Sequence, residues 1–144
     1  MKKTMRFVLL VSVTSALMLG ACTDVSRPAT KPAVPPAVTG TVTYLQRSAL
    51  PPTAVVEVQL QDVSLADAPA TIINTQTIET QGKQVPFPYK VPYDPARIEA
   101  SHHYAMRATI KDGDKLLFTT TQSYPVITNG APTSNVEIIV EPVP

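Results

Sequence analysis

Hydrophobic and polar residues alternate along most of the chain from about residue 38 onward, and this period of two predicts β-strands. One parity of each run is apolar and the other is rich in polar side chains, as expected for strands with one buried face. In this pattern Val58 and Ile138 point inward, and Gln59 and Glu137 point outward. The runs are Val38–Tyr44, Val56–Gln61, Thr71–Ile78, Phe87–Tyr93, Tyr104–Lys111, Lys115–Thr121 and Asn135–Glu141, with Tyr124–Thr128 as an eighth if it pairs separately.

Turn residues separate these runs and favour a two-layer fold. Asp112-Gly113 stands between two β-rich runs, which is a strong signal for a hairpin. The best candidate for a helix is the short segment Pro95–Ser101. Seven or eight short strands joined by loops of varied length predict an all-β, two-sheet antiparallel β-sandwich. A small closed barrel is the alternative.

One of the runs, Phe87–Tyr93, is expected at the edge of a sheet. Prolines at positions 86, 88 and 92 share one parity, and proline has no N–H group to donate to a neighbouring strand. An edge strand can accept an extended peptide as an additional strand. The candidate residues for such a partner site are Phe87, Tyr89, Val91 and Tyr93.

The first 21 residues have the organisation of a secretory signal peptide. Lys2, Lys3 and Arg6 precede or border an uncharged apolar stretch of thirteen residues, Phe7–Leu19. As a helix this stretch would span about 20 Å, whereas the hydrocarbon core of a membrane is roughly 30 Å thick. The sequence therefore favours a cleaved signal over a permanent transmembrane helix.

The end of the signal, Leu19-Gly20-Ala21-Cys22, resembles the lipobox of bacterial lipoproteins. The resemblance implies cleavage between Ala21 and Cys22, and attachment of diacylglycerol and an N-acyl lipid such as palmitate to Cys22. No other cofactor is expected. In the sorting rule of such lipoproteins, Asp after the cysteine favours the inner membrane. Thr23 stands there, so the periplasmic face of the outer membrane is expected, with the inner membrane as the weaker alternative.

Composition then divides the chain into three parts. Thr23–Ala37 holds four prolines in fifteen residues and no apolar period, which predicts an extended tether. The expected parts are a signal peptide (1–21), the lipidated cysteine with its tether (22–37) and the β-sandwich domain (38–144).

The net charge changes once the signal peptide is removed. Without Lys2, Lys3 and Arg6, the chain has nine basic and 11 acidic residues, a net charge of −2. This balance argues against a nucleic-acid partner, and a single cysteine excludes an intramolecular disulfide.

The adjacent histidines His102 and His103, with Glu99 and Asp94 nearby, are the candidates for a metal site. Neighbouring residues of a strand point to opposite faces, so both rings are not expected to bind one ion. A solvated strand start is the favoured interpretation, and no metal is expected.

Catalytic patterns are also weak. The segment Asp62-Val-Ser64-Leu-Ala-Asp67 resembles a carboxylate cluster, but Asp and Ser at the end of a strand more often bond their own backbone in a turn. The serines show no nucleophile motif, and five glycines form no phosphate-binding loop. We therefore expect no catalytic residue and no enzymatic activity. Tyr124, beside Pro125, is a weak candidate for ligand binding.

Several sequence blocks are spread over the whole domain from Val38 to Val143: Gly40–Tyr44, Leu50–Ser64, Ala66–Pro69, Pro92–Pro95, Tyr104–Arg107, Leu116–Thr120 and Tyr124–Val126. Together they resemble the YbaY and YscW lipoprotein family, which includes the pilotins of type III secretion. The resemblance implies a β-sandwich lipoprotein of the outer membrane, and the pilotin members bind secretin subunits and help them to assemble. The chain is more similar to the YbaY branch, so a secretin-like partner is not established by the resemblance.

These observations together predict a non-enzymatic envelope lipoprotein. Cys22 would anchor it to the membrane, and the sandwich would bind an envelope protein as a binding or assembly module, pilotin- or chaperone-like. The alternative is a periplasmic lipoprotein that binds a small ligand or a glycan.

Overall fold

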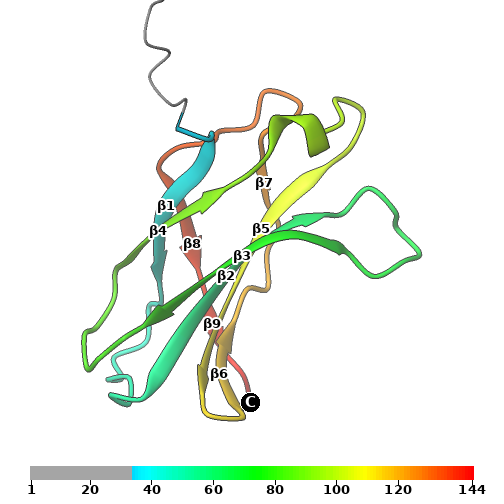
Figure 1. The fold of residues 1–144 in the computed structure, drawn as a ribbon. Coiled ribbons are helices and arrows are strands. Elements are labelled where there is room, and N and C mark those ends of the chain that lie inside the picture. Colours follow the sequence, from blue (N-terminus) through cyan, green and yellow to red (C-terminus); the bar gives the residue numbers. More distant parts are fainter. Residues whose placement is uncertain (1–33) are drawn as a thin grey trace, which may run out of the picture. The chain divides into compact units, whose positions relative to one another are not determined.

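The computed structural model describes residues 34–144, and the signal peptide and Cys22 lie outside the described residues. This part of the chain forms nine β-strands in two sheets and one short 3-10 turn, η1 (Pro95–Arg97) (Figure 1). The predicted all-β, two-sheet fold is confirmed. The helix expected over Pro95–Ser101 is reduced to this single turn, because Pro95 starts it and the backbone is extended again at Ile98.

The smaller sheet has three strands in the order β4-β1-β8. β4 runs antiparallel to β1, as expected, whereas β8 runs parallel to it. The parallel pair departs from the purely antiparallel pairing that we predicted. Alternation along the sequence reports which face is buried but not the direction of the neighbouring strand. The strands are β1 (Ala37–Thr43), β4 (Phe87–Pro92) and β8 (Val136–Ile139).

The larger sheet has six strands in the order β3-β2-β5-β6-β9, and β7 pairs with β5 beside this path. The predicted hairpin joins β5 to β6 through Gly113, whose φ of 57° suits a tight two-residue turn. The strands are β2 (Ala54–Asp62), β3 (Thr71–Glu79), β5 (Tyr104–Asp112), β6 (Lys115–Thr119), β7 (Tyr124–Val126) and β9 (Glu141–Pro142).

The hydrophobic core lies between the two sheets and follows the predicted parity. Val58 is fully buried, while its neighbour Gln59 is only partly covered on the outer face. Ile138 and Glu137 show the same division on β8. Burial of alternate apolar side chains from both sheets is the main stabilising contribution to this fold. The completely buried side chains include Val38, Val42, Val56, Val58, Leu60, Val91, Ala108, Ile110, Val126, Ile138 and Val140.

Side chains connect the two sheets at both of their long edges. On one side Asn74 and Gln76 of β3 bond to the backbone of β4. On the other side the Tyr124 hydroxyl donates to the carbonyl oxygen of Ile139 (3.1 Å) and accepts from its N–H (2.9 Å). Tyr124, a weak ligand candidate in the sequence, therefore has a structural role between β7 and β8.

The strand parity can be tested by truncating neighbouring residues of β2. Val58→Ala is expected to lower the free energy of unfolding by about 1–4 kcal/mol, because it removes buried methyl groups and leaves a cavity. Gln59→Ala should change it by less than about 0.5 kcal/mol. Urea denaturation followed by circular dichroism measures both values, and equal losses would contradict the register described here.

Candidate binding site

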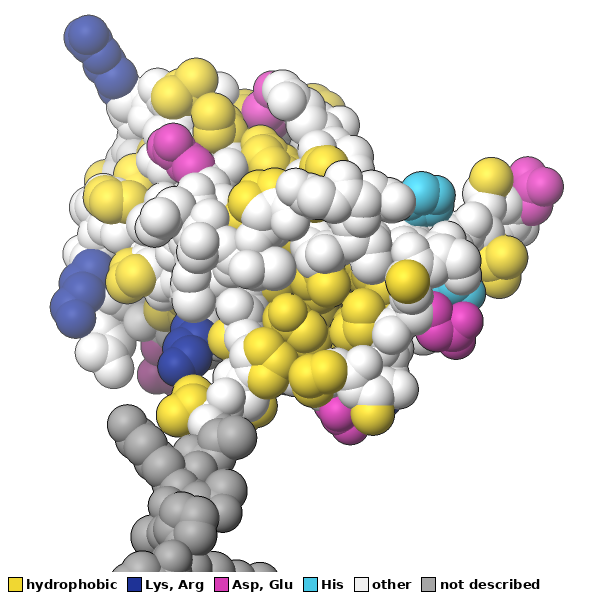
Figure 2. Space-filling model, turned by 90° about the horizontal axis from the view of Figure 1, so that it is seen from above, with side chains coloured by type: hydrophobic (Ala, Val, Ile, Leu, Met, Phe, Trp, Pro, Cys, Tyr) yellow, Lys and Arg dark blue, Asp and Glu magenta, His cyan; other side chains and the backbone are white. Residues whose placement is uncertain are grey.

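An apolar depression lies at the end of the sandwich where β1 begins and β4 ends. It consists of two adjoining hollows of about 600 and 440 Å³, which share Tyr93 and Pro95 in their walls. We call the two together the apical hollow. Figure 2 looks down on this end and shows hydrophobic side chains gathered in the middle of the face. The apolar walls are formed mainly by Val34, Pro36, Ile73, Ile98, Ala100 and Ile127.

Prolines and one backbone hydrogen bond shape the larger of the two hollows. The segment that leads into β1 is extended by Pro35 and Pro36. It is held against the end of β4 because the N–H of Tyr93 donates to the carbonyl oxygen of Pro36 (2.9 Å). Beyond Tyr93, the side chain of Asp94 caps η1 by accepting from the N–H of Ala96 (2.9 Å). The segment before β1 and the segment after β4 are thus fixed as walls of the apical hollow.

Charged side chains line only one part of the rim of the apical hollow. Asp94 and Arg97 line the larger hollow, while the polar residues of the smaller one, Thr128 and Asn129, carry no charge. A concave apolar surface with few polar groups is typical of a site that binds an apolar ligand or the apolar face of a protein segment.

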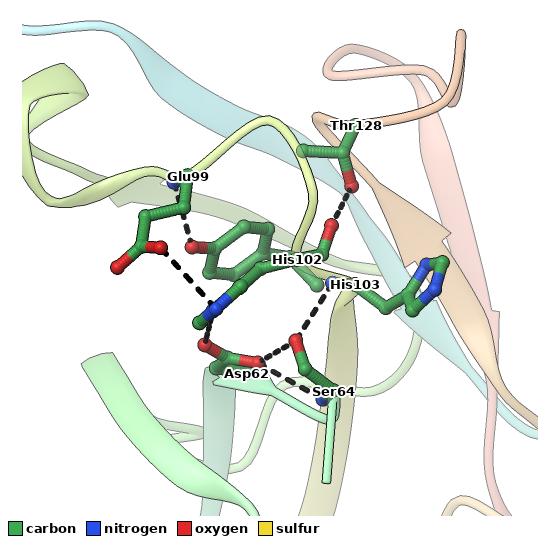
Figure 3. A network of polar contacts seen from close by, with 7 residues as sticks. Asp62, Ser64, Glu99, His102, His103 and Thr128 are labelled. Carbon is green, nitrogen blue, oxygen red and sulfur yellow. Dashed lines mark hydrogen bonds and ion pairs between the residues drawn. The ribbon is translucent and has the colours of Figure 1, made fainter.

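A polar network lies beside the smaller hollow and brings the candidate histidine and the candidate turn together (Figure 3). The Nδ1 atom of His102 lies 2.6 Å from Oδ2 of Asp62, and its Nε2 atom lies 3.3 Å from Oε2 of Glu99. Ser64 donates to Asp62 from its N–H (2.9 Å) and from its hydroxyl. The turn predicted at Asp62 and Ser64 is therefore confirmed, but its contact with His102 was not predicted.

The network shifts two ionisation equilibria in opposite directions. Burial raises the pKa of Asp62, but the hydrogen bonds from Ser64 and the interaction with His102 outweigh it, so the net pKa lies below its ordinary value. The hydrogen bond to Asp62 raises the pKa of His102 above the ordinary value of a histidine, with a smaller contribution from Glu99. Both shifts favour a carboxylate paired with an imidazolium.

The order of these groups does not suit nucleophilic catalysis. In a hydrolase triad the histidine lies between serine and carboxylate, so that it can take the proton of the serine. Here Asp62 lies between Ser64 and His102, and the Ser64 hydroxyl also accepts from the N–H of His103 (2.9 Å). Ser64 is thus held in a turn, and its hydroxyl contacts the Asp62 carboxylate rather than a histidine ring.

Of the residues considered for a metal site, His102 and Glu99 lie together, whereas His103 and Asp94 have other partners. His102 points toward Asp62, whereas the Nδ1 atom of His103 lies 3.0 Å from Nδ2 of Asn129 (Figure 3). Asp94 is occupied as the cap of η1. Asp67, which was considered only for a carboxylate cluster, is exposed in the loop between β2 and β3. Among residues 34–144, no three His, Cys, Asp or Glu side chains are grouped as metal ligands.

The predicted partner strand, β4, lies at a sheet edge but is shielded from pairing. Phe87, Tyr89 and Val91 are in the core, at most 4% exposed. The backbone N–H of Tyr93 donates toward the β1 side, so the backbone N–H and C=O groups of the even-numbered residues face the open edge. At this edge the prolines have no N–H group, and the N–H of Lys90 already donates to Oε1 of Gln76 (2.6 Å). These hydrogen bonds count against strand addition along β4. Of the four candidate residues, Tyr93 is the one that lines the apical hollow.

Comparison with known proteins places the chain in a family. Residues 33–138 match the family described as type III secretion system lipoprotein chaperone (YscW). The chain belongs to this family. It is 38% identical over 104 residues to the uncharacterized lipoprotein YbaY of Escherichia coli, covering 72% of this chain but only 55% of the length of YbaY.

A solved structure extends the family relationship to the fold. The chain is 47% identical to an alternative pilotin from the type II secretion system of Vibrio cholerae, with a TM-score of 0.67. The match covers 73% of this chain and 96% of that pilotin. The described domain therefore corresponds to nearly the whole of the pilotin structure, and the resemblance to the YbaY and YscW lipoproteins is confirmed.

The apical hollow itself was missed by sequence reasoning, because its walls come from four separate stretches of the chain. One local feature marks it: Ile127 adopts a φ of 71°. A β-branched residue rarely adopts this left-handed conformation.

No helix in the described part of the chain has the length and apolar character needed to cross a membrane.

Proposed function

We propose that this protein is a lipid-anchored, non-enzymatic binding module of the bacterial envelope, which holds an apolar segment of a protein partner in the apical hollow. The apical hollow carries the proposal, because it is a large concave apolar surface in a domain similar to a pilotin. Cys22 would provide the anchor, most simply at the periplasmic face of the outer membrane, and residues 23–37 the tether.

The chemistry of the apical hollow indicates the kind of segment that fits. Its walls are mostly Pro, Ile, Val and Tyr side chains, which favour an apolar face such as that of an amphipathic helix. Arg97 and Asp94 at the rim can pair with polar groups that flank this face. By its similarity to a type II secretion pilotin, the best candidate partner is a segment of a secretin subunit.

The backbone at Ile127 supports a binding role. A left-handed conformation costs a β-branched residue about 1–3 kcal/mol, and such strain is concentrated at functional sites. Asparagine would adopt the same conformation more easily, yet the chain places an apolar side chain there, in the wall of the smaller hollow. The side chain is partly buried against the core, and the part that lines the smaller hollow is available to an apolar partner.

Ile127→Asn is therefore a sharp test of the proposed site. The substitution removes an apolar wall and suits the local backbone, which offsets the loss of the partial packing of Ile127 against the core. Circular dichroism checks that the fold is retained. Capture of a segment of a secretin subunit by the immobilised protein is expected to fall at least about fivefold, the effect of losing one substantial apolar contact. Titration calorimetry or a pull-down with the labelled segment measures the change.

Leu45→Asn serves as the matched control. Leu45 is 77% exposed and lies just after the C-terminal end of β1. The apical hollow, with Val34 and Tyr93, lies at the N-terminal end of that strand. This variant should capture the segment as well as the unmodified protein. Equal loss in both variants would contradict a site at the apical hollow. Binding of a glycan or small apolar ligand that is lost in Ile127→Asn, without capture of any secretin segment, would support the small-ligand alternative.

A further inference from the structure

His102 connects segments that form both walls of the smaller hollow. Its backbone N–H donates to the carbonyl oxygen of Glu99 (3.0 Å), which lies between the wall residues Ile98 and Ala100. Its backbone carbonyl accepts from the hydroxyl of Thr128 (2.8 Å) in the facing wall. Figure 3 shows the residue between these two segments. A shift of His102 would therefore move both walls.

The imidazole of His102 fixes this connection to the larger sheet. Asp62 is the last residue of β2, and its Oδ2 atom lies 2.6 Å from Nδ1 of His102. Two bonds from Ser64 hold that carboxylate in place, and the carbonyl oxygen of His103 accepts from the N–H of Val63 (2.8 Å). The carboxylate of Asp62 is thus held firmly on the sheet side. The His102 ring joins it to the wall segments, beside the bond from the N–H of Glu99 to the Tyr104 hydroxyl (3.0 Å).

We propose that His102 is a positioning residue for the apical hollow, and that its protonated ring holds the two walls at a fixed spacing. The inference rests on the binding role proposed above, because that role gives the spacing its consequence. At a pH where the ring is neutral, one hydrogen bond to Asp62 remains and the attraction of Glu99 is lost. The hollow would then be less firmly defined.

The groups around the ring support a response in the neutral pH range. Asp62 approaches from β2 and Glu99 from the preceding loop, and both carboxylates favour the imidazolium. Tyr104 of β5 lies beside the ring with centroids 6.4 Å apart, and Ile127, Thr128 and Asn129 bring no charge from the facing wall. The His102 side chain is 36% exposed, so protons can reach it from solvent.

The coupling can be read directly by NMR on the whole protein in detergent micelles between pH 5 and 8.5. The His102 ring is expected to titrate above the ordinary histidine value of about 6.5. The amide signals of Ile98, Ala100 and Thr128 should shift with the same midpoint. In Asp62→Asn, which can still accept from the N–H of Ser64, the ring midpoint should fall and the Thr128 shift should decrease by at least half.

His103→Gln is the matched control, because the neighbouring ring faces Asn129 rather than Asp62. It should leave the response of Ile98 and Thr128 unchanged. The proposal is overturned if Thr128 does not follow the His102 ring, or follows it equally in Asp62→Asn. If Asp62→Asn does not fold, Glu99→Gln should still lower the ring midpoint, and no change there would count against the proposal. Because the amide signals are recorded without a partner, failure of secretin capture is distinguishable from failure of the coupling.

Discussion

Gly40→Ala is expected to destabilise the protein by about 3 kcal/mol or more, at the upper end for an overpacked site. A Cβ atom at position 40 would lie 1.8 Å from the carbonyl oxygen of Val136 and 2.8 Å from the Tyr89 hydroxyl. Favourable contacts between non-bonded heavy atoms lie near 3.5–4.0 Å. Gly40 pairs with Val136 where β1 meets β8, so relief would require separation of the parallel strands. Urea denaturation followed by circular dichroism measures the loss.

Two further variants identify the cause of this loss. Thr41→Ala changes the next residue of the same strand without adding an atom, and should cost less than about 1 kcal/mol. Adding Tyr89→Phe to Gly40→Ala should not restore stability, because the backbone oxygen of Val136 is the nearer obstacle and the Tyr89 hydroxyl donates to it (2.9 Å). Recovery in the double variant, or a loss below about 1 kcal/mol for Gly40→Ala alone, would contradict the close approach of β1 and β8.

The alternation of side chains was enough to predict the buried faces but not the way in which the strands pair. Val58 and Ile138 are in the core because parity is a local property, set by every second residue of a strand. The parallel neighbour of β1 is β8, about a hundred residues further along the chain, and the contact requires Gly40 to lie against Val136. The significance of that glycine becomes evident only from the backbone that faces it.

Prediction of the candidate site was limited for a related reason. Tyr93 was identified as a candidate partner residue, but as part of a strand-addition site along β4. The open edge of β4 is shielded by its prolines and by Gln76 of β3. Its neighbours in the apical hollow, such as Val34 and Ile127, come from distant segments with no shared motif. The turn at Asp62 and Ser64 was predictable because it forms between two residues that are only two positions apart in the sequence. The contact of Asp62 with His102 depends instead on the pairing of β2 with β5.

Cys22→Ser is expected to abolish lipid attachment and membrane retention completely while the domain remains folded. A single acyl chain gives marginal membrane binding, and each buried CH₂ contributes about 0.8 kcal/mol, so two or three chains retain a protein effectively permanently. Without the thiol of Cys22 no chain is attached. Cys22 lies well before Ala37, where β1 begins, so the strands of the sandwich do not include it. Labelling with a palmitate analogue and membrane fractionation measure both effects.

Two variants in the adjacent segment separate lipidation from sorting. Ser26→Ala should be labelled and retained like the unmodified protein, since it leaves Leu19–Cys22 intact. Thr23→Asp should also be labelled, but it should move the protein from the outer to the inner membrane if the residue after the cysteine directs sorting. Equal labelling of Cys22→Ser and the unmodified protein would exclude Cys22 as the anchor. Full labelling of Thr23→Asp with unchanged distribution would leave the anchor in place and contradict the expected sorting signal, because the two variants change the attachment and the destination independently.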